Sequence, residues 1–400
     1  MSKVQLFRSD DVGAPQLTSS MGSLISLLDA CLLAPAATAA TGTATSGQGF
    51  FNKVTTMTRA DAVIVAGVRT NQVKYTFSSP HGFRKYQTIF ARASAANASF
   101  TGGGRIVAAN SLSVTVELMG VPSSDFIIAD ANAVAYVMGA MWIKGEAGIN
   151  TAAYHSWVST DGGNLPCSLS VDDTYGTYAK VRGFETMLSP ITGDGMFPTL
   201  AQQANYAIPK NVDATTPAPW ILLVDGTMFY LFTSTYPNVR IFQGFVFGYP
   251  KTRMAADEYG CVIHAMPAAN ATWSGGLFMN SGLNNASYPL YYARGISQIG
   301  GSVPSYAYGN GICGFGNGSE AFPSPIDNGL NVAPVYLYSS GFRSILKGCL
   351  QPLHNMPLYG GGFYDGLTDY PNQNVIAIPT SAGYTSPQSG EVHFIIDGSW

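Results

Sequence analysis

The feature that most constrains the fold is a pair of apolar runs joined by an Asp-Gly dipeptide. Residues 220–224 and 227–232 are almost entirely aliphatic or aromatic, and Asp225 and Gly226 stand between them. Because Asp-Gly favours the backbone of a tight β-turn, this is the strongest hairpin signal in the sequence. We therefore expect a hairpin at the centre of a β-rich domain. Its expected core residues are Trp220, Leu222, Phe229 and Leu231.

Other segments alternate apolar and polar residues with a period of two, which marks strands with one wet face. Residues 73–77 and 112–118 follow this pattern. The 45 glycines, 23 prolines and 12% aromatic residues also suit strands and turns better than helices. We predict a mainly β protein. Further predicted strands cover residues 133–143, 167–187 (two strands), 220–224, 227–232, 241–249, 261–266, 335–338, 375–378 and 392–396.

We divide the chain into three parts. Residues 1–50 are predicted to be an N-terminal anchor, made of a helix and an Ala/Thr/Gly linker. Residues 51–145 are predicted to form a small β-barrel or sandwich domain, and residues 146–400 a larger β-rich domain with long loops.

The one predicted helix covers residues 21–33, after the N-cap candidates Ser19 and Ser20. A helix of about three turns is marginal alone, so its apolar face must pack on something. Since residues 34–49 form a flexible linker of small residues, we expect this segment to be tethered and to dock on a neighbouring subunit. The alternative is that the helix packs on its own chain. The docking residues would be Leu24, Leu27, Leu28 and Leu32.

Charge is scarce. Lys and Arg number 20 and Asp and Glu 23, so charged residues make up 11% of the chain, against roughly 25% in ordinary domains. A protein of this size exposes about 15,000 Å², which gives about one charge per 350 Å² where about 150 Å² is usual. We therefore expect much of the surface to be buried against copies of the same chain or other subunits.

The charge balance and the apolar runs also exclude some partners. A net charge of −3 without a basic cluster leaves little for phosphate binding, so we expect no nucleic acid partner. The longest apolar run, residues 24–37, contains Ser26 and Asp29 and is too short to span a bilayer. We expect no membrane insertion and no signal peptide.

No spacing of residues indicates a cofactor or metal site. The five cysteines are widely separated and contain no CxxC, which suits buried thiols in a protein made in a reducing cytoplasm. The five histidines are scattered, and His264 lies within an apolar run, where a core histidine is expected. Residues 309–314 match GxGxxG, but no apolar strand precedes them and no helix follows, so we interpret them as a loop.

Carboxylates are the remaining catalytic candidates, since a glycosidase needs two of them about 5 to 9 Å apart. Adjacent Asp172 and Asp173 on a strand would point to opposite faces, and they are better explained by turn formation. With no nucleophile elbow either, we expect that the chain is not an enzyme. The candidates weighed are Asp172, Asp173, Glu185, Asp194, Asp225, Asp365 and Asp369.

The stretch from residue 273 to 315 is rich in Tyr, Trp, Asn and Gly, a composition typical of adaptable recognition loops. The alternative is that these loops pack against neighbouring subunits. The possible recognition residues are Trp273, Tyr288, Tyr306 and Tyr308.

Several short motifs together resemble the virion structural proteins of tailed double-stranded DNA bacteriophages, of the tail or baseplate type. Two of them, Val-Arg-Gly-Phe-Glu-Thr-Met at residues 181–187 and Gly-Met-Phe-Pro-Thr at 195–199, lie close together in the sequence. The others are residues 7–17, 22–32, 79–83, 219–222 and 350–354.

This resemblance implies a virion protein, synthesised in the bacterial cytoplasm, that forms an oligomeric part of the tail, baseplate or tail tip. Its partners would be copies of itself, other virion proteins and, at the tip, a host surface receptor. Alternatives are a head decoration protein, a receptor-binding protein of the tail, or a tail-borne glycan depolymerase. The resemblance brings no catalytic residues with it.

Overall fold

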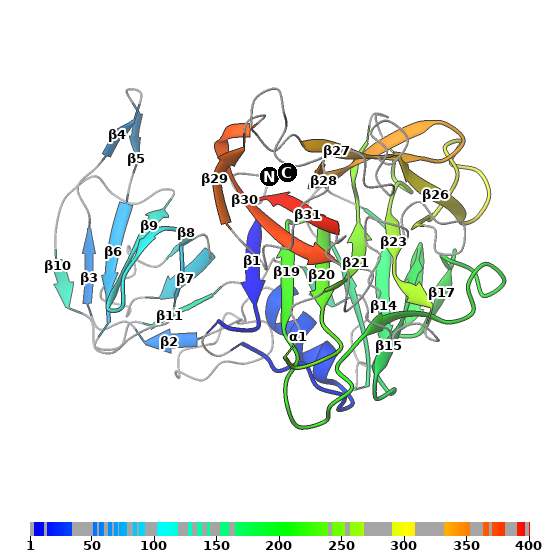
Figure 1. The fold of residues 1–400 in the computed structure, drawn as a ribbon, viewed down its shortest axis with the longest axis horizontal. Helices are drawn as coiled ribbons and strands as arrows, with labels where there is room; N and C mark the ends of the chain where they lie inside the picture. The colour runs from blue at the N-terminus through cyan, green and yellow to red at the C-terminus, as the bar shows by residue number, and fades with distance from the viewer. Residues whose placement is uncertain are drawn as a thin grey trace. The chain divides into compact units, whose positions relative to one another are not determined.

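The computed structural model is mainly β, as the sequence predicts, with 31 strands and one helix in the part of the chain that it describes (Figure 1). The described residues are 4–11, 14–33, 51–53, 56–59, 63–65, 68–70, 72–77, 83–85, 88–92, 102–118, 127–129, 134–137, 142–144, 153–159, 165–238, 242–252, 257–267, 290–308, 332–352, 363–367, 370–380, 390–396 and 400.

The chain divides into two compact units. The large unit comprises Met1–Val4, Gln16–Ser26 and Trp142–Trp400, and the small unit comprises Gln5–Pro15 and Leu27–Met141. Neither unit consists of residues 1–50 alone, because the division shares the N-terminal segment between them.

The small unit contains an antiparallel sheet in the order β10-β3-β6-β9-β8-β7-β11-β2. Its predicted alternation is present, since Tyr75, Val114 and Val116 are buried whereas Lys74 is exposed. Leu112 instead lies exposed in the turn before β9. The strands of this unit are β1 (Gln5–Arg8), β2 (Phe51–Lys53), β3 (Thr56–Arg59), β4 (Val63–Val65), β5 (Val68–Thr70), β6 (Gln72–Thr76), β7 (Thr88–Arg92), β8 (Gly102–Ala109), β9 (Ser113–Leu118), β10 (Ile127–Ala129) and β11 (Val134–Val137).

One sheet of the large unit runs in the order β12-β13-β14-β15-β18-β24, and a separate hairpin, β16–β17, follows β15 in the chain. The two strands predicted within residues 167–187 are confirmed as β14 and β15, which pair antiparallel. The bounds are β12 (Ile143–Lys144), β13 (Tyr154–Val158), β14 (Ser168–Asp172), β15 (Tyr178–Phe184), β16 (Thr186–Ser189), β17 (Thr192–Asp194), β18 (Tyr206–Pro209) and β24 (Met266–Pro267).

The other sheet of this unit includes the run β19-β20-β21-β23-β25-β26-β27-β28-β31-β30-β29, with β22 paired to β28. The bounds are β19 (Trp220–Val224), β20 (Met228–Thr233), β21 (Gln243–Gly248), β22 (Lys251–Thr252), β23 (Val262–His264), β25 (Leu290–Tyr292), β26 (Val303–Tyr308), β27 (Val332–Tyr338), β28 (Phe342–Pro352), β29 (Phe363–Leu367), β30 (Tyr370–Thr380) and β31 (Gly390–Ile395).

The predicted central hairpin is confirmed. β19 and β20 pair from Trp220 opposite Thr233 to Val224 opposite Phe229, and Asp225 stands in the turn between them. Every residue of both strands is buried, so both faces of this hairpin are covered and not only one. This explains why the runs read as continuously apolar rather than alternating.

Aromatic side chains join the two sheets of the large unit. The rings of Tyr206 on β18 and Tyr291 on β25 meet edge to face, 5.9 Å apart, and the Tyr206 hydroxyl donates to the Ile263 carbonyl of β23. Trp142 packs against Phe229 of β20 at 5.4 Å. The core of this unit therefore lies between the two sheets.

Two expectations need correction. The strand predicted over residues 133–143 is two strands, β11 and β12, which belong to different sheets. Tyr306 and Tyr308 lie not in a loop but in β26, paired with β25 and β27. Residues 303–308 form a strand too short to be recognised by its alternation, because Gly- and Ser-rich segments that favour loops flank it. Trp273 and Tyr288 lie outside the described residues.

Within the described residues, no helix is both long enough and apolar enough to cross a membrane.

Replacing Trp220 by alanine should lower the free energy of unfolding by about 3 to 5 kcal/mol, because it leaves a cavity in a fully buried hairpin. Urea unfolding followed by tryptophan fluorescence and circular dichroism measures the change. Val212→Ala, at an exposed position of the same unit, is the control and should change stability by less than about 0.5 kcal/mol. A loss below about 1 kcal/mol in Trp220→Ala would place the core elsewhere.

Candidate functional site

Two of the sequence motifs, residues 181–187 and 195–199, meet in the folded chain. The backbone N–H of Gly183 donates to the Phe197 carbonyl at 2.8 Å, and the N–H of Phe197 donates back at 2.9 Å. The Phe197 ring lies directly over Gly183, where an added Cβ would fall 2.3 Å from a ring carbon. Gly183 is therefore required by close packing, and the two motifs are halves of one local structure.

Arg182 and Glu185 extend from this junction. Arg182 donates to the carbonyls of Gln203 and Ala204 at 2.6 and 2.7 Å, and burial lowers its pKa to about 10, so it stays charged at neutral pH. Gly195 has a φ of +64°, and its Cα lies so close to Glu185 that a Cβ there would clash with that side chain. The backbone thus fixes where the Glu185 carboxylate points.

The Glu185 carboxylate receives both arms of the Arg294 guanidinium. Nε and Nη2 of Arg294 donate to its two oxygens at 2.7 and 2.5 Å. This bidentate contact raises the pKa of Arg294. The guanidinium also lies over the Tyr259 ring, 3.5 Å from its centroid. Arg294 remains 28% exposed in this arrangement, so the pair sits at the edge of the unit's interior.

A second arginine–carboxylate pair lies deeper. Arg343, on β28, is fully buried and donates from Nε and Nη2 to the two oxygens of Asp257, at 2.9 and 2.8 Å. Its guanidinium lies over the Tyr292 ring at 4.0 Å, and the Tyr292 hydroxyl hydrogen-bonds Ser344. One bidentate contact, made of two hydrogen bonds, and the face of the Tyr292 ring stabilise a charge that would otherwise be costly to bury.

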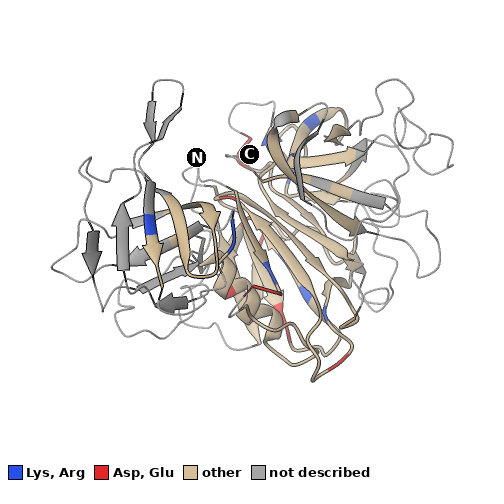
Figure 2. Ribbon diagram, turned by 60° about the vertical axis from the view of Figure 1, so that its left-hand side comes forward, with Lys and Arg blue, Asp and Glu red and all other residues tan. Residues whose placement is uncertain are grey.

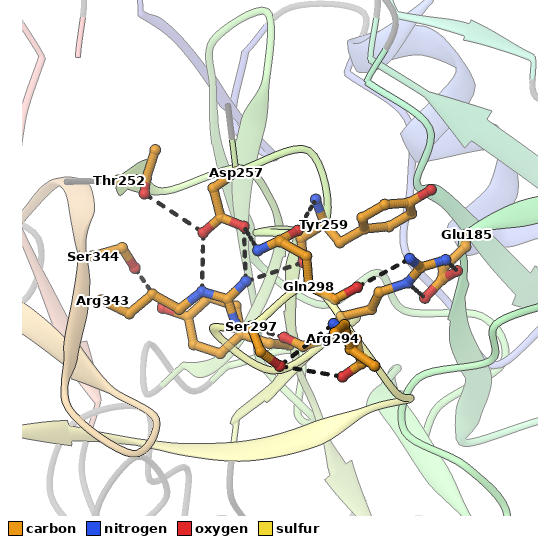
Figure 3. A network of polar contacts seen from close by, with 11 residues as sticks. Glu185, Thr252, Asp257, Tyr259, Arg294, Ser297, Gln298, Arg343 and Ser344 are labelled. Atoms are coloured by element: carbon orange, nitrogen blue, oxygen red, sulfur yellow. Dashed lines mark hydrogen bonds and ion pairs between the residues drawn. The ribbon is translucent and has the colours of Figure 1, made fainter. Parts of the chain in front are cut away.

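Backbone and amide groups connect the two pairs, and Figure 3 shows Gln298 between them. Gln298 donates from Nε2 to Asp257 at 2.6 Å, and its carbonyl accepts from Nη1 of Arg294 at 3.2 Å. Arg343 also donates from Nη1 to the Arg294 carbonyl at 2.5 Å. We call these residues, Glu185, Asp257, Arg294, Gln298 and Arg343, the arginine brace.

The arginine brace connects segments of the chain through ion pairs and hydrogen bonds. Each arginine has a bidentate carboxylate partner, and each carboxylate is already occupied by a guanidinium. An arginine fork filled in this way is not open to a substrate carboxylate or phosphate. The brace joins β28, the segment before β23, the segment after β25 and the base of hairpin β16–β17.

A third pair fixes the central hairpin. Asp225 accepts at Oδ1 from the backbone N–H groups of Thr227 and Met228, both at 2.7 Å, which closes the predicted turn. Lys347 of β28 donates to its other oxygen at 3.2 Å and also to the Thr227 hydroxyl. Since Arg343 and Lys347 are four residues apart on one strand, β28 carries two cations that each reach an aspartate elsewhere in the unit.

A fourth carboxylate holds the N-terminal segment. Asp173 is fully buried and accepts at Oδ2 from the backbone N–H groups of Leu24 and Ile25, at 2.9 and 3.4 Å. Lys210, also fully buried, donates to Oδ1 of Asp173 at 2.5 Å and to the Ser20 carbonyl at 2.9 Å. Burial raises the pKa of Asp173, and Lys210 opposes that effect. We call Asp173, Lys210 and Ser20 the N-terminal clasp.

The clasp makes Asp173 a cap for helix α1 (Ser23–Leu32), because its carboxylate satisfies amide groups of the first turn. The predicted cap residues, Ser19 and Ser20, do not take this role: the Ser19 N–H donates to the Asp213 carbonyl and the Ser20 carbonyl accepts from Lys210. The segment Gln16–Ser26 belongs to the large unit, whereas Leu27–Met141 belongs to the small unit. The anchor role of residues 1–50 stays a prediction.

The four helix leucines, Leu24, Leu27, Leu28 and Leu32, are fully buried in the single chain. In this conformation none of them is free for a neighbouring subunit, which favours the alternative that the helix packs on its own chain. An assembly role for these leucines stays a prediction.

The remaining carboxylate candidates do not converge on one site. Asp172 accepts from the N–H and hydroxyl of Thr174, which confirms its expected turn role. Asp194 is exposed on β17. The backbone of Asp365 lies in β29, and Asp369 is outside the described residues. Asp173, Glu185 and Asp225 are each paired with a different cation.

Four thiols and the His264 imidazole are core groups. Cys31, Cys167, Cys261 and Cys349 are free and buried. His264 is buried on β23, as predicted, and burial lowers its pKa to about 4, so it is neutral at pH 7. Among the residues that the structure describes, no group of three or more His, Cys, Asp or Glu could hold a metal ion.

No local pattern in the sequence predicts the pairing of six residues: Asp257, Arg294, Gln298, Arg343, Lys210 and Lys347. Arg343 and Lys347 carry the one usable signal, since both are cations within the otherwise largely apolar run of residues 342–350. A cation at such a position needs a buried partner. The sequence does not say which of 23 acidic residues supplies it.

Comparisons of the sequence with known proteins do not assign the chain to a family. No protein-family model matches the chain, and the search of curated proteins finds no match.

Replacing Arg343 by methionine should lower the free energy of unfolding by about 3 to 5 kcal/mol, because Asp257 is left as an uncompensated buried charge. Arg294→Met is the matched control. It also removes a bidentate arginine over a tyrosine ring, but from a partly exposed pair, and should cost about 1 kcal/mol or less. Urea unfolding measures both. Equal losses would show that burial does not decide the strength of these pairs.

Replacing Lys210 by methionine should cost about 3 to 5 kcal/mol, because Asp173 then loses the cation that offsets its burial. Hydrogen exchange at the Leu24 and Ile25 amides should accelerate, since their acceptor is weakened. Lys180→Met, at a partly exposed lysine of β15, should leave both readouts near wild type. If Lys210→Met unfolds at the wild-type urea concentration, the clasp does not hold the N-terminal segment.

Proposed function

We propose that this protein is a structural component of a tailed bacteriophage virion, located at the tail, baseplate or tail tip and assembled as an oligomer. The proposal begins from the sequence motifs that resemble such proteins. In the proposed organisation, a small β-barrel or sandwich domain and a larger β-rich domain with long loops form one subunit. Its partners are copies of itself and other virion proteins.

The observation that carries the proposal is where the chain places its few charges. Four ion pairs within the large unit use eight of the 43 charged residues, and the two deepest pairs, Asp173–Lys210 and Asp257–Arg343, are withdrawn from the surface. Figure 2 shows that blue and red segments are few along the described ribbon, even with the residues of these pairs included. A surface so poor in charge suits a subunit whose faces are covered in an assembly. The four pairs are Asp173–Lys210, Glu185–Arg294, Asp225–Lys347 and Asp257–Arg343.

The same placement supports a role without catalysis. A glycan depolymerase would need two carboxylates free to act together as acid and as base or nucleophile. Three of the candidates, Asp173, Glu185 and Asp225, instead neutralise cations that tie segments together. This commitment of carboxylates to internal pairs favours a structural protein over a tail-borne hydrolase.

Immunogold labelling of intact particles tests the proposal. An antibody raised against the whole chain, applied to particles purified from the bacteriophage that encodes it, should label the tail or its tip in electron micrographs. An antibody against the major capsid protein serves as the positional control. Label confined to the head would favour the decoration role, and absence of the chain from purified particles by mass spectrometry would refute the proposal.

A further inference from the structure

The N-terminal clasp places an amine beside a carboxyl group where neither side chain is exposed to solvent. The Nζ atom of Lys210 lies 2.5 Å from Oδ1 of Asp173, and both side chains are 0% exposed. The lysine–aspartate pair at the central hairpin differs in both respects. Nζ of Lys347 lies 3.2 Å from Asp225, and these side chains remain 15% and 8% exposed. The clasp therefore holds a buried amine and a carboxyl group at closer range than the hairpin does.

Regular backbone structure fixes both groups of the clasp. Asp173 directly follows β14, and its N–H donates to the Ala153 carbonyl at 2.8 Å. Lys210 directly follows β18, and its N–H donates to the Thr177 carbonyl at 2.8 Å. β15 pairs with both of these strands. Since the two groups meet across one strand of a sheet, the entropy of bringing them together is lost during folding and not in a later reaction.

The buried pair has a neutral form. Burying two opposite charges carries a desolvation penalty, and transfer of one proton from the ammonium of Lys210 to Oδ1 of Asp173 removes both charges. In the same direction, burial raises the pKa of the Asp173 carboxyl group against the opposing effect of Lys210. Proton transfer leaves a free amine, which is a nucleophile, beside a carboxylic acid, whose carbon that amine can attack.

The remaining contacts suit an attack of this amine on Cγ of Asp173. An amine 2.5 Å from Oδ1 is at most about 3.7 Å from Cγ, and atoms poised to react are about 3 to 3.5 Å apart. Oδ2 accepts from the N–H groups of Leu24 and Ile25 at 2.9 and 3.4 Å, in the first turn of α1. These donors are placed to stabilise the negative charge that Oδ2 gains when Cγ becomes tetrahedral.

We propose that Lys210 and Asp173 become joined by an isopeptide bond. Nζ attacks Cγ and forms the new C–N bond, Oδ1 accepts a second proton from the nitrogen, and the C–Oδ1 bond breaks to release water. The third proton of the original ammonium stays on the nitrogen as the amide N–H. An amine and a carboxylic acid give an amide and one water, so the reaction consumes no oxidant, reductant or cofactor. The ion pair of the clasp is the reactant.

The product keeps the contacts of the clasp. Oδ2 becomes the amide carbonyl oxygen and still accepts from Leu24 and Ile25. The amide N–H donates to the Ser20 carbonyl, which Nζ of Lys210 already contacts at 2.9 Å. A hydrogen-bonded amide costs less to bury than two charges, so burial favours the product. This covalent tie between the ends of β14 and β18 goes beyond the proposed function and does not depend on it.

Mass spectrometry of the intact full-length chain provides the test, on freshly purified protein and after prolonged incubation at neutral pH. The wild type should contain, or convert to, a species about 18 Da lighter than the mass calculated from its sequence, which is the loss of one water. Trypsin does not cleave after an acylated lysine, so this species should yield residues 145–180 joined to residues 183–240. Without the bond, cleavage after Lys210 releases residues 183–210 and 211–240 separately.

Lys210→Arg is the matched variant, because a guanidinium keeps the charge but is not a nucleophile, and it should show neither the mass loss nor the joined peptides. Lys347 is a control within the wild-type chain, since its longer and partly exposed pair should stay unlinked and trypsin should cleave after it. The wild type alone decides the test, whether or not the variant folds.

Two outcomes would overturn the inference. One is a wild-type chain that keeps its full mass and is cleaved completely after Lys210 throughout the incubation. The other is a loss of water confined to residues 211–240, which would reflect dehydration at Asp225-Gly226 and not a bond to Lys210.

Discussion

The buried pair of Arg343 and Asp257 sets the conditions for much of the large unit. A guanidinium without solvent contact must find its partners inside the protein, and here they come from segments far apart in the sequence. Gln298 and Arg294 extend those partners to Glu185, so the base of hairpin β16–β17 is fixed through the same network. The Glu185–Arg294 pair therefore adds directional bonds to the apolar packing between the two sheets, beside the hydrogen bond from Tyr206 to the Ile263 carbonyl.

The N-terminal clasp applies the same principle to the start of the chain. A short helix contributes little stability of its own, and its first amide groups lack partners within the helix. Asp173 supplies those partners from the end of β14, and Lys210 supplies the opposite charge. Burial of the apolar face of α1 stabilises the helix, but apolar packing alone does not fix the residue at which the helix begins. The clasp decides where the first turn begins.

The sequence predicts what depends on local pattern. The alternation at residues 73–77, the Asp-Gly turn at 225–226 and the paired strands at 167–187 were all recognisable, because period and turn chemistry are local properties. The arginine brace and the clasp were not, since most of their contacts join residues far apart in the sequence, up to 190 positions between Ser20 and Lys210. The hydrogen bond from the Leu24 N–H to Asp173 spans 149 positions, and no local pattern in the N-terminal segment indicates it.

The two motifs at 181–187 and 195–199 have a physical meaning that bears on function. Gly183 is required by the Phe197 ring, Gly195 by the Glu185 side chain, and Glu185 by Arg294. A sequence that keeps these residues keeps a joint between strands, whether or not the joint touches a ligand. These motif residues therefore have roles in the scaffold of this unit. This joint holds hairpin β16–β17 in place, because the hairpin begins and ends beside it. The hairpin exposes a leucine and an isoleucine, so a function of this region would depend on that surface more than on the joint itself.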